Sequence, residues 1–316
     1  MTYVLLILGF VLLIKGADWL VDGASSLAHR YGISTLVIGL TIVSLGTSAP
    51  ELVVNILATI QGSTDLALGN ILGSNITNIL LILGVSAVIY PIALKRNTVW
   101  KEVPFALLAV IVLFLFVNDV SIDHGSFSIL GRVDGLVLLA FLIIFLYYIF
   151  AIAKDGTEED VKIKKRSLHM SILLILSGVL GLLLGGQWIV KGALGIAELF
   201  GASETLVGLT IVAIGTSLPE LAASVMAAYK KQADIVIGTV VGSNILNIFL
   251  VLGTVSVIRP IPFSIDLNVD LFIVLASTVF LFLAMFVGKR HTLQRWQGIG
   301  FVLLYIGYFA FVILRG

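Results

Sequence analysis

The chain carries the sequence GTSAPE at residues 46–51 and GTSLPE at residues 215–220, each inside a long apolar stretch. Both hexapeptides place a glycine, two hydroxyl side chains, a proline and a glutamate where the surrounding sequence is almost purely apolar. A proline lacks the amide N–H that a helix requires, and its ring crowds the carbonyl four residues earlier. The two stretches therefore predict two interrupted helices, each of which carries a carboxylate.

The composition is that of a membrane protein. Of the 316 residues, 59% are apolar and 12% are charged, and the mean hydropathy is +1.15. Soluble domains are about 45–50% apolar and about 25% charged. The net charge of +1 gives no reason to expect nucleic acid as a partner. The absence of cysteine excludes disulfides, thiolate metal sites and cysteine catalysis.

Ten segments are long and apolar enough to cross a bilayer, since a spanning helix needs about 20 mainly apolar residues. We expect an all-α membrane protein with ten transmembrane helices. Their approximate ranges are 2–27, 34–59, 66–90, 102–118, 131–153, 168–199, 204–228, 235–258, 268–288 and 295–314. The one sizeable polar connection, residues 154–166, separates two sets of five helices.

The two sets match each other in sequence. GADWLV at 16–21 aligns with GGQWIV at 185–190, and GSNI at 73–76 aligns with GSNI at 242–245. The offset is 169 residues at every match, including the two GTS motifs. This indicates an internal duplication, with repeats at 1–153 and 168–316 joined by a linker at 154–167. Because five is odd, the second repeat enters the membrane from the opposite side, which is a common plan for secondary transporters.

The distribution of basic residues predicts the orientation. Loops after odd-numbered spans hold fourteen Lys and Arg residues, whereas the opposite side holds three. Cytoplasmic loops carry the excess of Lys and Arg. We therefore expect a multi-pass protein of the cell membrane with both termini extracellular and the 154–166 loop in the cytoplasm.

Helical spacing assembles a candidate ion site around the two glutamates. Thr47 and Ser48 precede Glu51 by four and three residues, so the three side chains share one helix face. Thr216, Ser217 and Glu220 repeat this pattern. A carboxylate at the bilayer centre costs about 2.5–3.5 kcal/mol on insertion scales and usually marks an ion or proton path. We expect broken helices 2, 3, 7 and 8 to surround this site at the midplane.

The third and eighth spans add further oxygen atoms. Ser74 and Asn78 are four residues apart, as are Ser243 and Asn247. Pro50 and Pro219 can free backbone carbonyls, which are tolerated in a membrane where they line a polar cavity. The complete set holds no sulfur and no imidazole. Calcium prefers six to eight such oxygen ligands, whereas zinc and copper favour His or Cys; sodium accepts the same oxygen ligands as calcium.

The paired motifs resemble the two alpha-repeats of the sodium/calcium exchanger family, within the cation/calcium exchanger superfamily, in its prokaryotic form. GTSAPE and GTSLPE are each followed by a GSN-containing helix, GNILGSNITN and GTVVGSNILN. The resemblance covers all ten spans. It implies exchange of Na⁺ for Ca²⁺ by alternating access, with spans one and six as a sliding gate. Its ligand positions fall on Thr47, Ser48, Glu51, Ser74, Asn78, Thr216, Ser217, Glu220, Ser243 and Asn247, together with the backbone carbonyls of Ser44 and Ala213.

The resemblance also predicts the coupling. Potassium-dependent relatives carry an aspartate at the position of Asn247, so we expect exchange that does not require K⁺. If three Na⁺ replace one Ca²⁺, as in the family, one net charge crosses per cycle and transport is electrogenic. The transported ions are then the substrates, and no cofactor or obligatory protein partner is expected, since no nucleotide-binding G-x-x-x-x-G-K-[ST] motif is present.

Three other classes of function are weighed. A Ca²⁺/H⁺ or other cation/proton antiporter could use the same two glutamates to bind protons. A channel would display pore-lining rings contributed by several subunits. Here two halves of one chain build one closed site, which does not suggest a channel. An intramembrane enzyme with Ser48 or Ser217 as nucleophile would need a nearby base. The histidines lie in or beside loops, so we expect no enzyme activity.

Two further polar groups are interpreted as structural. Asn75 and Asn244 follow the paired serines by one residue and turn away from the shared face. We expect them to hydrogen-bond between helices, as polar side chains in membrane bundles do. Asp18 and Asp22 lie near the cytoplasmic end of span one, where we expect solvation or an ion pair with Lys15.

Overall fold

The computed structural model describes residues 2–62, 64–96, 98–118, 128–153, 165–199 and 213–315, and these residues are almost entirely helical. The first half contains α1 (Thr2–Tyr31), α2 (Thr35–Ile38), η1 (Gly39–Val43), α3 (Ser44–Thr47), α4 (Ala49–Ile60), α5 (Thr64–Ile76), η2 (Thr77–Leu83), α6 (Gly84–Ile89), η3 (Thr98–Glu102), α7 (Val103–Val117) and α9 (Arg132–Ile152). The second half contains α10 (Leu168–Leu199), α12 (Ala213–Thr216), α13 (Leu218–Tyr229), α14 (Ala233–Leu246), η5 (Asn247–Leu252), α15 (Gly253–Ile258), η6 (Ile265–Leu267), α16 (Asn268–Ala284) and α17 (Arg295–Arg315).

Short antiparallel pairs join the loops at the helix ends. Strand β1 (Ile92–Ala93) pairs with β4 (Thr292–Leu293), and β2 (Ile129–Leu130) pairs with β3 (Ile261–Pro262). Each pair links a loop of the first half with a loop of the second half. The sequence did not predict these strands, because two residues are too few to produce an alternating pattern.

The helices confirm a multi-pass membrane protein. Within the described residues, seven helices are long and apolar enough to cross a bilayer, or eight if the bent pair Thr35–Thr47 and Ala49–Ile60 counts as one span. The described residues begin again at 213, so the first part of the predicted span 204–228 lies outside them. The number of ten spans therefore stays a prediction.

The proline motifs interrupt their helices as expected. The axes of Thr35–Thr47 and Ala49–Ile60 differ by 44°. The break is at Ser48 (φ −85°, ψ 3°), and Pro50 stands in the first turn of α4, where its missing N–H is not needed. Ser217 has nearly the same backbone angles (φ −88°, ψ 2°), and Pro219 stands in the first turn of α13. The two GTS-x-PE motifs thus fold in the same local way.

The prediction that the third and eighth spans are broken is wrong. Ala67–Ile89 and Ala233–Ile258 are each helical throughout. In place of a break, each span contains a π-helical segment. In the third span this is η2, which begins at Thr77, next to Asn78; in the eighth it is η5, which begins at Asn247. Neither span contains a proline, so no N–H is lost. The helix therefore continues through a π-helical turn instead of breaking, and such turns are frequent at functional sites.

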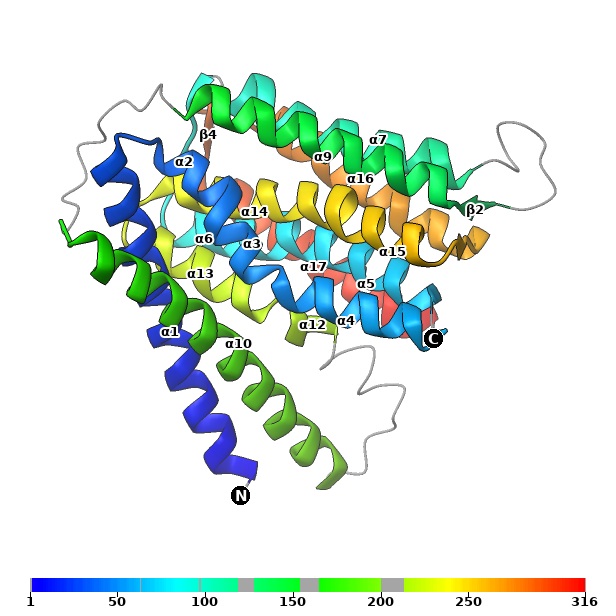
Figure 1. Cartoon of the computed structure of the whole chain (residues 1–316), viewed down its shortest axis with the longest axis horizontal. Helices are drawn as coiled ribbons and strands as arrows, with labels where there is room; N and C mark the ends of the chain where they lie inside the picture. Colours follow the sequence, from blue (N-terminus) through cyan, green and yellow to red (C-terminus); the bar gives the residue numbers. More distant parts are fainter. Residues whose placement is uncertain are drawn as a thin grey trace.

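Helices α1 and α10 form a closely packed pair along one edge of the molecule (Figure 1). Glycines at their contact let the two backbones touch. A Cβ atom at Gly16 would lie 2.7 Å from the backbone nitrogen of Leu182, and one at Gly178 would lie 2.6 Å from that of Leu20. This is the small-residue packing that brings membrane helices together. The pair corresponds to the predicted first and sixth spans.

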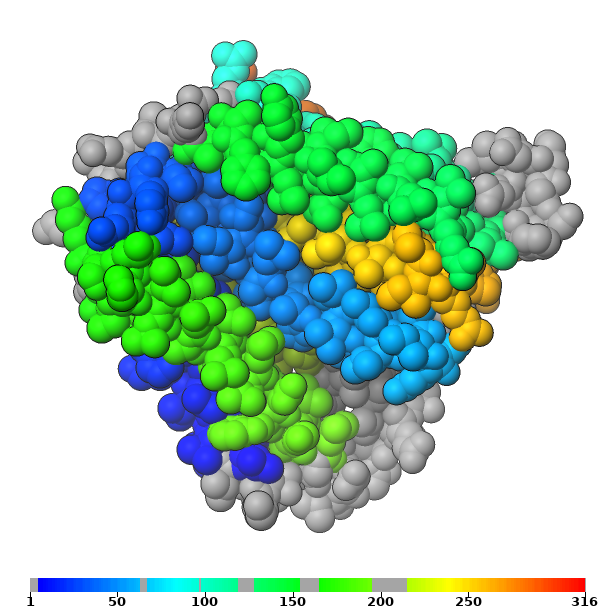
Figure 2. Space-filling view, in the orientation of Figure 1, coloured from blue at the N-terminus to red at the C-terminus, as the bar shows by residue number. Residues whose placement is uncertain are grey.

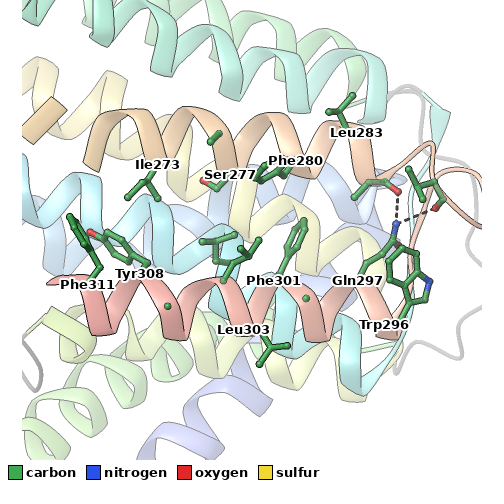
Figure 3. Close-up of a pocket in the computed structure, with 17 residues that line it drawn as sticks. Ile273, Ser277, Phe280, Leu283, Trp296, Gln297, Phe301, Leu303, Tyr308 and Phe311 are labelled. Atoms are coloured by element: carbon green, nitrogen blue, oxygen red, sulfur yellow. Dashed lines mark hydrogen bonds between the residues drawn. The ribbon is translucent and has the colours of Figure 1, made fainter. Parts of the chain in front are cut away.

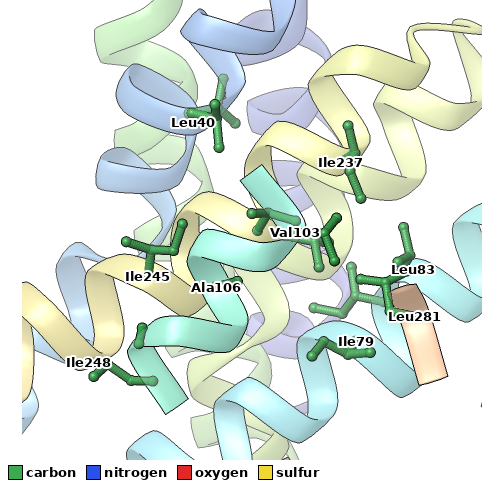
Figure 4. Close-up of a cluster of buried hydrophobic side chains, with 14 of the residues drawn as sticks. Leu40, Ile79, Leu83, Val103, Ala106, Ile237, Ile245, Ile248 and Leu281 are labelled. Atoms are coloured by element: carbon green, nitrogen blue, oxygen red, sulfur yellow. The ribbon is translucent and has the colours of Figure 1, made fainter. Parts of the chain in front are cut away.

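The opposite edge is formed by α7 and α9, and α14 runs through the centre (Figure 1). Every residue of α14 from Asp234 to Leu246 is buried, as expected for a helix covered on all sides. Apolar side chains of η2, α7, α14 and η5 meet around it (Figure 4). On the face shown in Figure 2, α2, α3 and α4 cross the molecule beside α14 and α15. The proline break between α3 and α4 therefore lies beside the buried central helix α14.

Candidate functional site

The two glutamates lie inside the protein and do not face the lipid. Glu51 is 1% exposed and Glu220 is 2% exposed. Each stands in the first turn of the helix that follows its break, α4 or α13. The N-terminal end of a helix carries a partial positive charge, which stabilises an anion placed there. The local fold thus offsets part of the cost of burying each carboxylate.

Ser48 connects the two halves of the chain at this point. Its Oγ lies 2.9 Å from Glu220 Oε1 and 2.9 Å from Ser243 Oγ. A hydroxyl has one proton, so the geometry fits donation by Ser48 to the carboxylate and donation by Ser243 to Ser48. Ser48 belongs to the break just before Glu51, and the motifs predicted to converge do converge.

Several buried oxygen atoms at this place have no hydrogen-bond partner among the described residues. Buried polar groups are nearly always hydrogen-bonded, so a cluster of exceptions requires an explanation. Six of them belong to side chains predicted to bind the ion: Glu51 Oε2, Glu220 Oε2, Ser74 Oγ, Ser217 Oγ, Asn78 Oδ1 and Asn247 Oδ1. Such oxygen atoms are the ligands that hard cations prefer.

The remaining predicted ligands are already engaged. The carbonyl of Ser44 accepts from Ser48 N at 2.9 Å and from Thr47 Oγ1 at 3.2 Å, so both of its lone pairs have partners. Thr216 Oγ1 donates to Asn70 Oδ1 at 3.5 Å. Ala213 begins the short helix α12. An ion that used Ser44 O would have to displace one of these contacts, whereas Thr47 Oγ1 donates to Ser44 O and keeps its lone pairs for an ion.

Asn75 and Asn244 join the two central helices to each other. The Nδ2 atom of each donates to the backbone carbonyl of the other at 3.4 Å. Asn78 Nδ2 donates to Asn244 Oδ1 at 2.9 Å, and Asn247 Nδ2 donates to Asn75 Oδ1 at 3.0 Å. The prediction that these two asparagines bond between helices is confirmed. They also orient Asn78 and Asn247, whose Oδ1 atoms are left without protein partners.

Comparison with known proteins assigns this arrangement to a family. The sequence model of the sodium/calcium exchanger protein family matches residues 1–151 and 170–314. The chain belongs to the sodium/calcium exchanger family. It is 39% identical to CaxA of Alkalimonas amylolytica over 316 residues, covering 96% of each chain. It is 29% identical to the sodium/calcium exchanger MaX1 of Methanosarcina acetivorans, covering 97% of each chain.

The fold is also that of a solved member of the family. A structure of the sodium-calcium exchanger NCX_Mj, soaked with 10 mM Na⁺ and zero Ca²⁺, matches with a TM-score of 0.85 and 34% sequence identity. The match covers 98% of each chain. The family assignment made from the paired GTS-x-PE motifs is therefore confirmed.

The site in this member of the family includes two asparagines that the sequence reasoning missed. Asn55, 1% exposed, donates from Nδ2 to the carbonyl of Glu51 at 2.7 Å. Asn70 Nδ2 donates to Asn55 Oδ1 at 3.4 Å. Together with Thr216 they form a polar chain that runs from the Glu51 carbonyl to the GTS motif that precedes Glu220. Helical spacing could have found both, since Asn55 lies four residues after Glu51 and Asn70 four residues before Ser74.

The part of the chain that the structure describes holds no His- or Cys-rich site of the kind that transition metals prefer. Among the described residues, no group of three or more His, Cys, Asp or Glu side chains could hold a metal ion. The site has two carboxylates, and hydroxyl and amide oxygens supply the rest. This donor set fits Ca²⁺ or Na⁺, and an ion bound here would be the cargo of a family member.

The two aspartates of α1 stay partly exposed, as the expectation of solvation has it, but their ion pair is with Lys230 and not with Lys15. Lys230, at the end of α13, has its Nζ atom 2.6 Å from Asp18 Oδ1 and 2.6 Å from Asp22 Oδ1. Beside this contact, Ser25 Oγ donates to Gln232 Oε1 at 2.7 Å. The sequence could not show that the turn after α13 packs against α1. These contacts tie the predicted gate helix to the part of the chain that carries Glu220.

Proposed function

We propose that the protein exchanges Na⁺ for Ca²⁺ across the cell membrane by alternating access, with Glu51 and Glu220 as the shared charged ligands. The proposed ligand set adds the hydroxyls of Thr47, Ser48, Ser74, Thr216, Ser217 and Ser243, the amide oxygens of Asn78 and Asn247, and the carbonyls of Ser44 and Ala213. No cofactor, nucleotide or covalent step is part of the proposal.

One observation carries the proposal. Two buried carboxylates stand at equivalent helix breaks, and each keeps one oxygen, Oε2, without a hydrogen-bond partner among the described residues. Two ionised carboxylates at a common place repel each other unless a cation lies between them. A divalent ion neutralises both, which supports Ca²⁺ as one substrate. The names of MaX1 and NCX_Mj as sodium/calcium exchangers support Na⁺ as the other.

The proposed architecture is two inverted five-helix repeats, residues 1–153 and 168–316, with ten spans in all. The reciprocal hydrogen bonds of Asn75 and Asn244 support it, because residues related by a twofold axis contact each other in both directions. The matched backbone angles of Ser48 and Ser217 support it as well. We further propose that both termini are extracellular and that residues 154–166 are cytoplasmic, from the distribution of Lys and Arg.

Charge counting gives the proposed cycle its voltage dependence. Two ionised glutamates and one Ca²⁺ sum to zero, whereas the same glutamates and three Na⁺ carry one positive charge. Moving one charge is worth about 2.3 kcal/mol per 100 mV. Exchange in that ratio would therefore be electrogenic, and the sodium gradient and the membrane potential would set its direction.

The test is uptake of ⁴⁵Ca into proteoliposomes of the purified protein under imposed ion gradients. We expect an outward Na⁺ gradient to drive calcium inward, external K⁺ to make little difference, and the rate to change with an imposed potential. Uptake that follows a pH gradient and ignores Na⁺ would replace the proposal with a Ca²⁺/H⁺ antiporter. Uptake that occurs without any counter-ion would indicate a channel.

A further inference from the structure

A long apolar groove lies between α16 and α17, away from the ion site. It has a volume of about 970 Å³ and is lined almost entirely by apolar atoms. Figure 3 shows it running along both helices, from Phe311 and Tyr308 at one end to Trp296 and Gln297 at the other. A groove of this kind on a membrane helix pair is open to an apolar chain.

The groove exists because the two helices pack on different neighbours. Helix α16 packs on α7 and α5, whereas α17 packs on α6 and η2. The pair is held together by polar contacts near the two ends. At one end Gln297 Nε2 donates to the carbonyls of Ala284 and Val287, at 2.8 and 3.1 Å (Figure 3). At the other end Asp270 accepts from Tyr308 OH at 3.0 Å and pairs with Arg315 at 2.8 Å.

Two glycines of α17 deepen the groove along its length. A Cβ atom built at Gly300 or at Gly307 would meet no described heavy atom within 4 Å. Other glycines, such as Gly16 and Gly178, serve close backbone packing between α1 and α10. These two glycines line the groove with nothing packed against them, so they leave room for another molecule.

The charges at the two mouths of the groove differ. At the Phe311 end, the cation Arg315 is paired with the buried Asp270. At the Trp296 end, the exposed residues Lys289, Arg290 and Arg295 have no ion pair with a carboxylate in the described part of the chain. Within the described residues, Arg295 donates a hydrogen bond to the carbonyl of Ile89 at 3.4 Å. One mouth therefore presents unneutralised positive charge, and the other does not.

We propose that this groove binds an anionic phospholipid from the leaflet beside the α16–α17 connection. An acyl chain lies in the groove over Gly300 and Gly307, and the phosphate contacts Lys289, Arg290 and Arg295. Juxtamembrane basic clusters attract anionic lipids by about 1 kcal/mol for each Lys or Arg. Trp296, 56% exposed at the same mouth, is of the residue type that sits at headgroup level.

The occupant would touch the helix that carries part of the ion site. Leu80 lines the groove and belongs to η2, the π-helical segment that contains Asn78. The hydroxyl of Thr77, next to Asn78, bonds Tyr305 of α17 at 3.3 Å. A lipid held between α16 and α17 would therefore contact η2 through Leu80.

The test is native mass spectrometry of the intact protein in an equimolar mixture of phosphatidylglycerol and phosphatidylcholine. We expect the wild-type protein to retain phosphatidylglycerol at least fivefold over phosphatidylcholine. The triple variant Lys289→Gln, Arg290→Gln, Arg295→Gln should bring this ratio close to one. Gly307→Leu, whose side chain would fill the groove, should lower the retention of both lipids.

Arg30→Gln is the matched control, since Arg30 is an exposed cation at the end of α1. It should leave the lipid ratio unchanged. Because the three charged residues are exposed and Gly307 faces open space, the variants should unfold at the wild-type temperature, which is measured in parallel. A wild-type ratio near one, or a ratio that the triple variant leaves unchanged, overturns the proposal. A dimer mass that Gly307→Leu abolishes would instead assign the groove to a second copy of the chain.

Discussion

Ser48 and Ser217 occupy equivalent positions in the two GTS motifs, yet the structure gives them different surroundings. Ser48 Oγ lies 2.9 Å from both Glu220 Oε1 and Ser243 Oγ. Ser217 is 2% exposed, and its Oγ has no hydrogen-bond partner among the described residues. We predict that Ser48→Ala destabilises the ion-free protein and that Ser217→Ala does not.

The expected difference follows from the contacts that each substitution removes. A hydrogen bond to a charged group contributes about 1.5–3 kcal/mol, and its loss leaves the buried Glu220 with an unpaired oxygen. Removing a buried hydroxyl that has no partner costs little. A change of 1 kcal/mol shifts the unfolding temperature of a chain of a few hundred residues by about 2–4 °C. Ser48→Ala should therefore unfold roughly 3–12 °C below Ser217→Ala by the same scale.

The assay is thermal unfolding in detergent at one fixed scan rate, with calcium chelated and sodium replaced by choline. A fixed rate is needed because unfolding of such proteins is commonly irreversible. Added Ca²⁺ should stabilise both variants less than wild type, since each has lost a proposed ligand. Ser86→Ala is the control, because Ser86 lies in α6, outside the proposed site, and its buried hydroxyl has no hydrogen-bond partner among the described residues. Equal losses of stability in the two ion-free variants would refute the reasoning.

Three further outcomes are expected. Glu51→Gln or Glu220→Gln should abolish ⁴⁵Ca uptake into proteoliposomes while the protein still inserts, because neither variant can neutralise a divalent ion. Near-normal calcium flux in both variants would remove the site assignment. Lys230→Gln should lower the unfolding temperature by roughly 2–4 °C, because a partly exposed ion pair is worth about 1 kcal/mol. Lys230→Arg should recover most of this loss. An unchanged unfolding temperature in Lys230→Gln would mean that the pair contributes nothing to stability. Gly178→Ala should destabilise the protein by about 1–3 kcal/mol, because the added Cβ forces α1 and α10 apart. Gly300→Ala should not destabilise it. Equal unfolding temperatures for these two variants would contradict the close contact between α1 and α10.

The sequence predicts the local structure of the site better than its tertiary contacts. The prolines mark both helix breaks, and the 169-residue offset pairs the residues that later meet, because both signals are local or internal to the sequence. The third and eighth spans were predicted to be broken, whereas they contain the π-helical segments η2 and η5. A π-helical turn has one extra residue, and no residue type in the sequence identifies it. The pairing of Lys230 with Asp22 depends on which turn packs against α1, and this tertiary contact cannot be predicted from the local sequence.

The site also shows why equivalent residues need not have equivalent contacts. Ser48 Oγ donates to Glu220 Oε1, whereas its counterpart Ser217 Oγ has no hydrogen-bond partner among the described residues. On the proposed inverted arrangement, Ser217 could serve Glu51 as Ser48 serves Glu220. A hydrogen bond lost in one half can then be replaced by its counterpart in the other half. Two arrangements of similar energy are what alternating access requires, since a transporter must populate both.

The ion pair at Lys230 breaks this balance, because it has no counterpart. The 169-residue offset places Lys191 opposite Asp22 and Gln61 opposite Lys230, so the other end of the molecule cannot form the same carboxylate–ammonium contact. The pair at 2.6 Å therefore stabilises only the arrangement in which the turn after α13 meets α1. A bias of about 1 kcal/mol changes the ratio of two states about fivefold. On the proposed exchange cycle, the residues that depart from the repeat would thus set which side of the membrane the gate favours, while the residues that obey it would build the ion site.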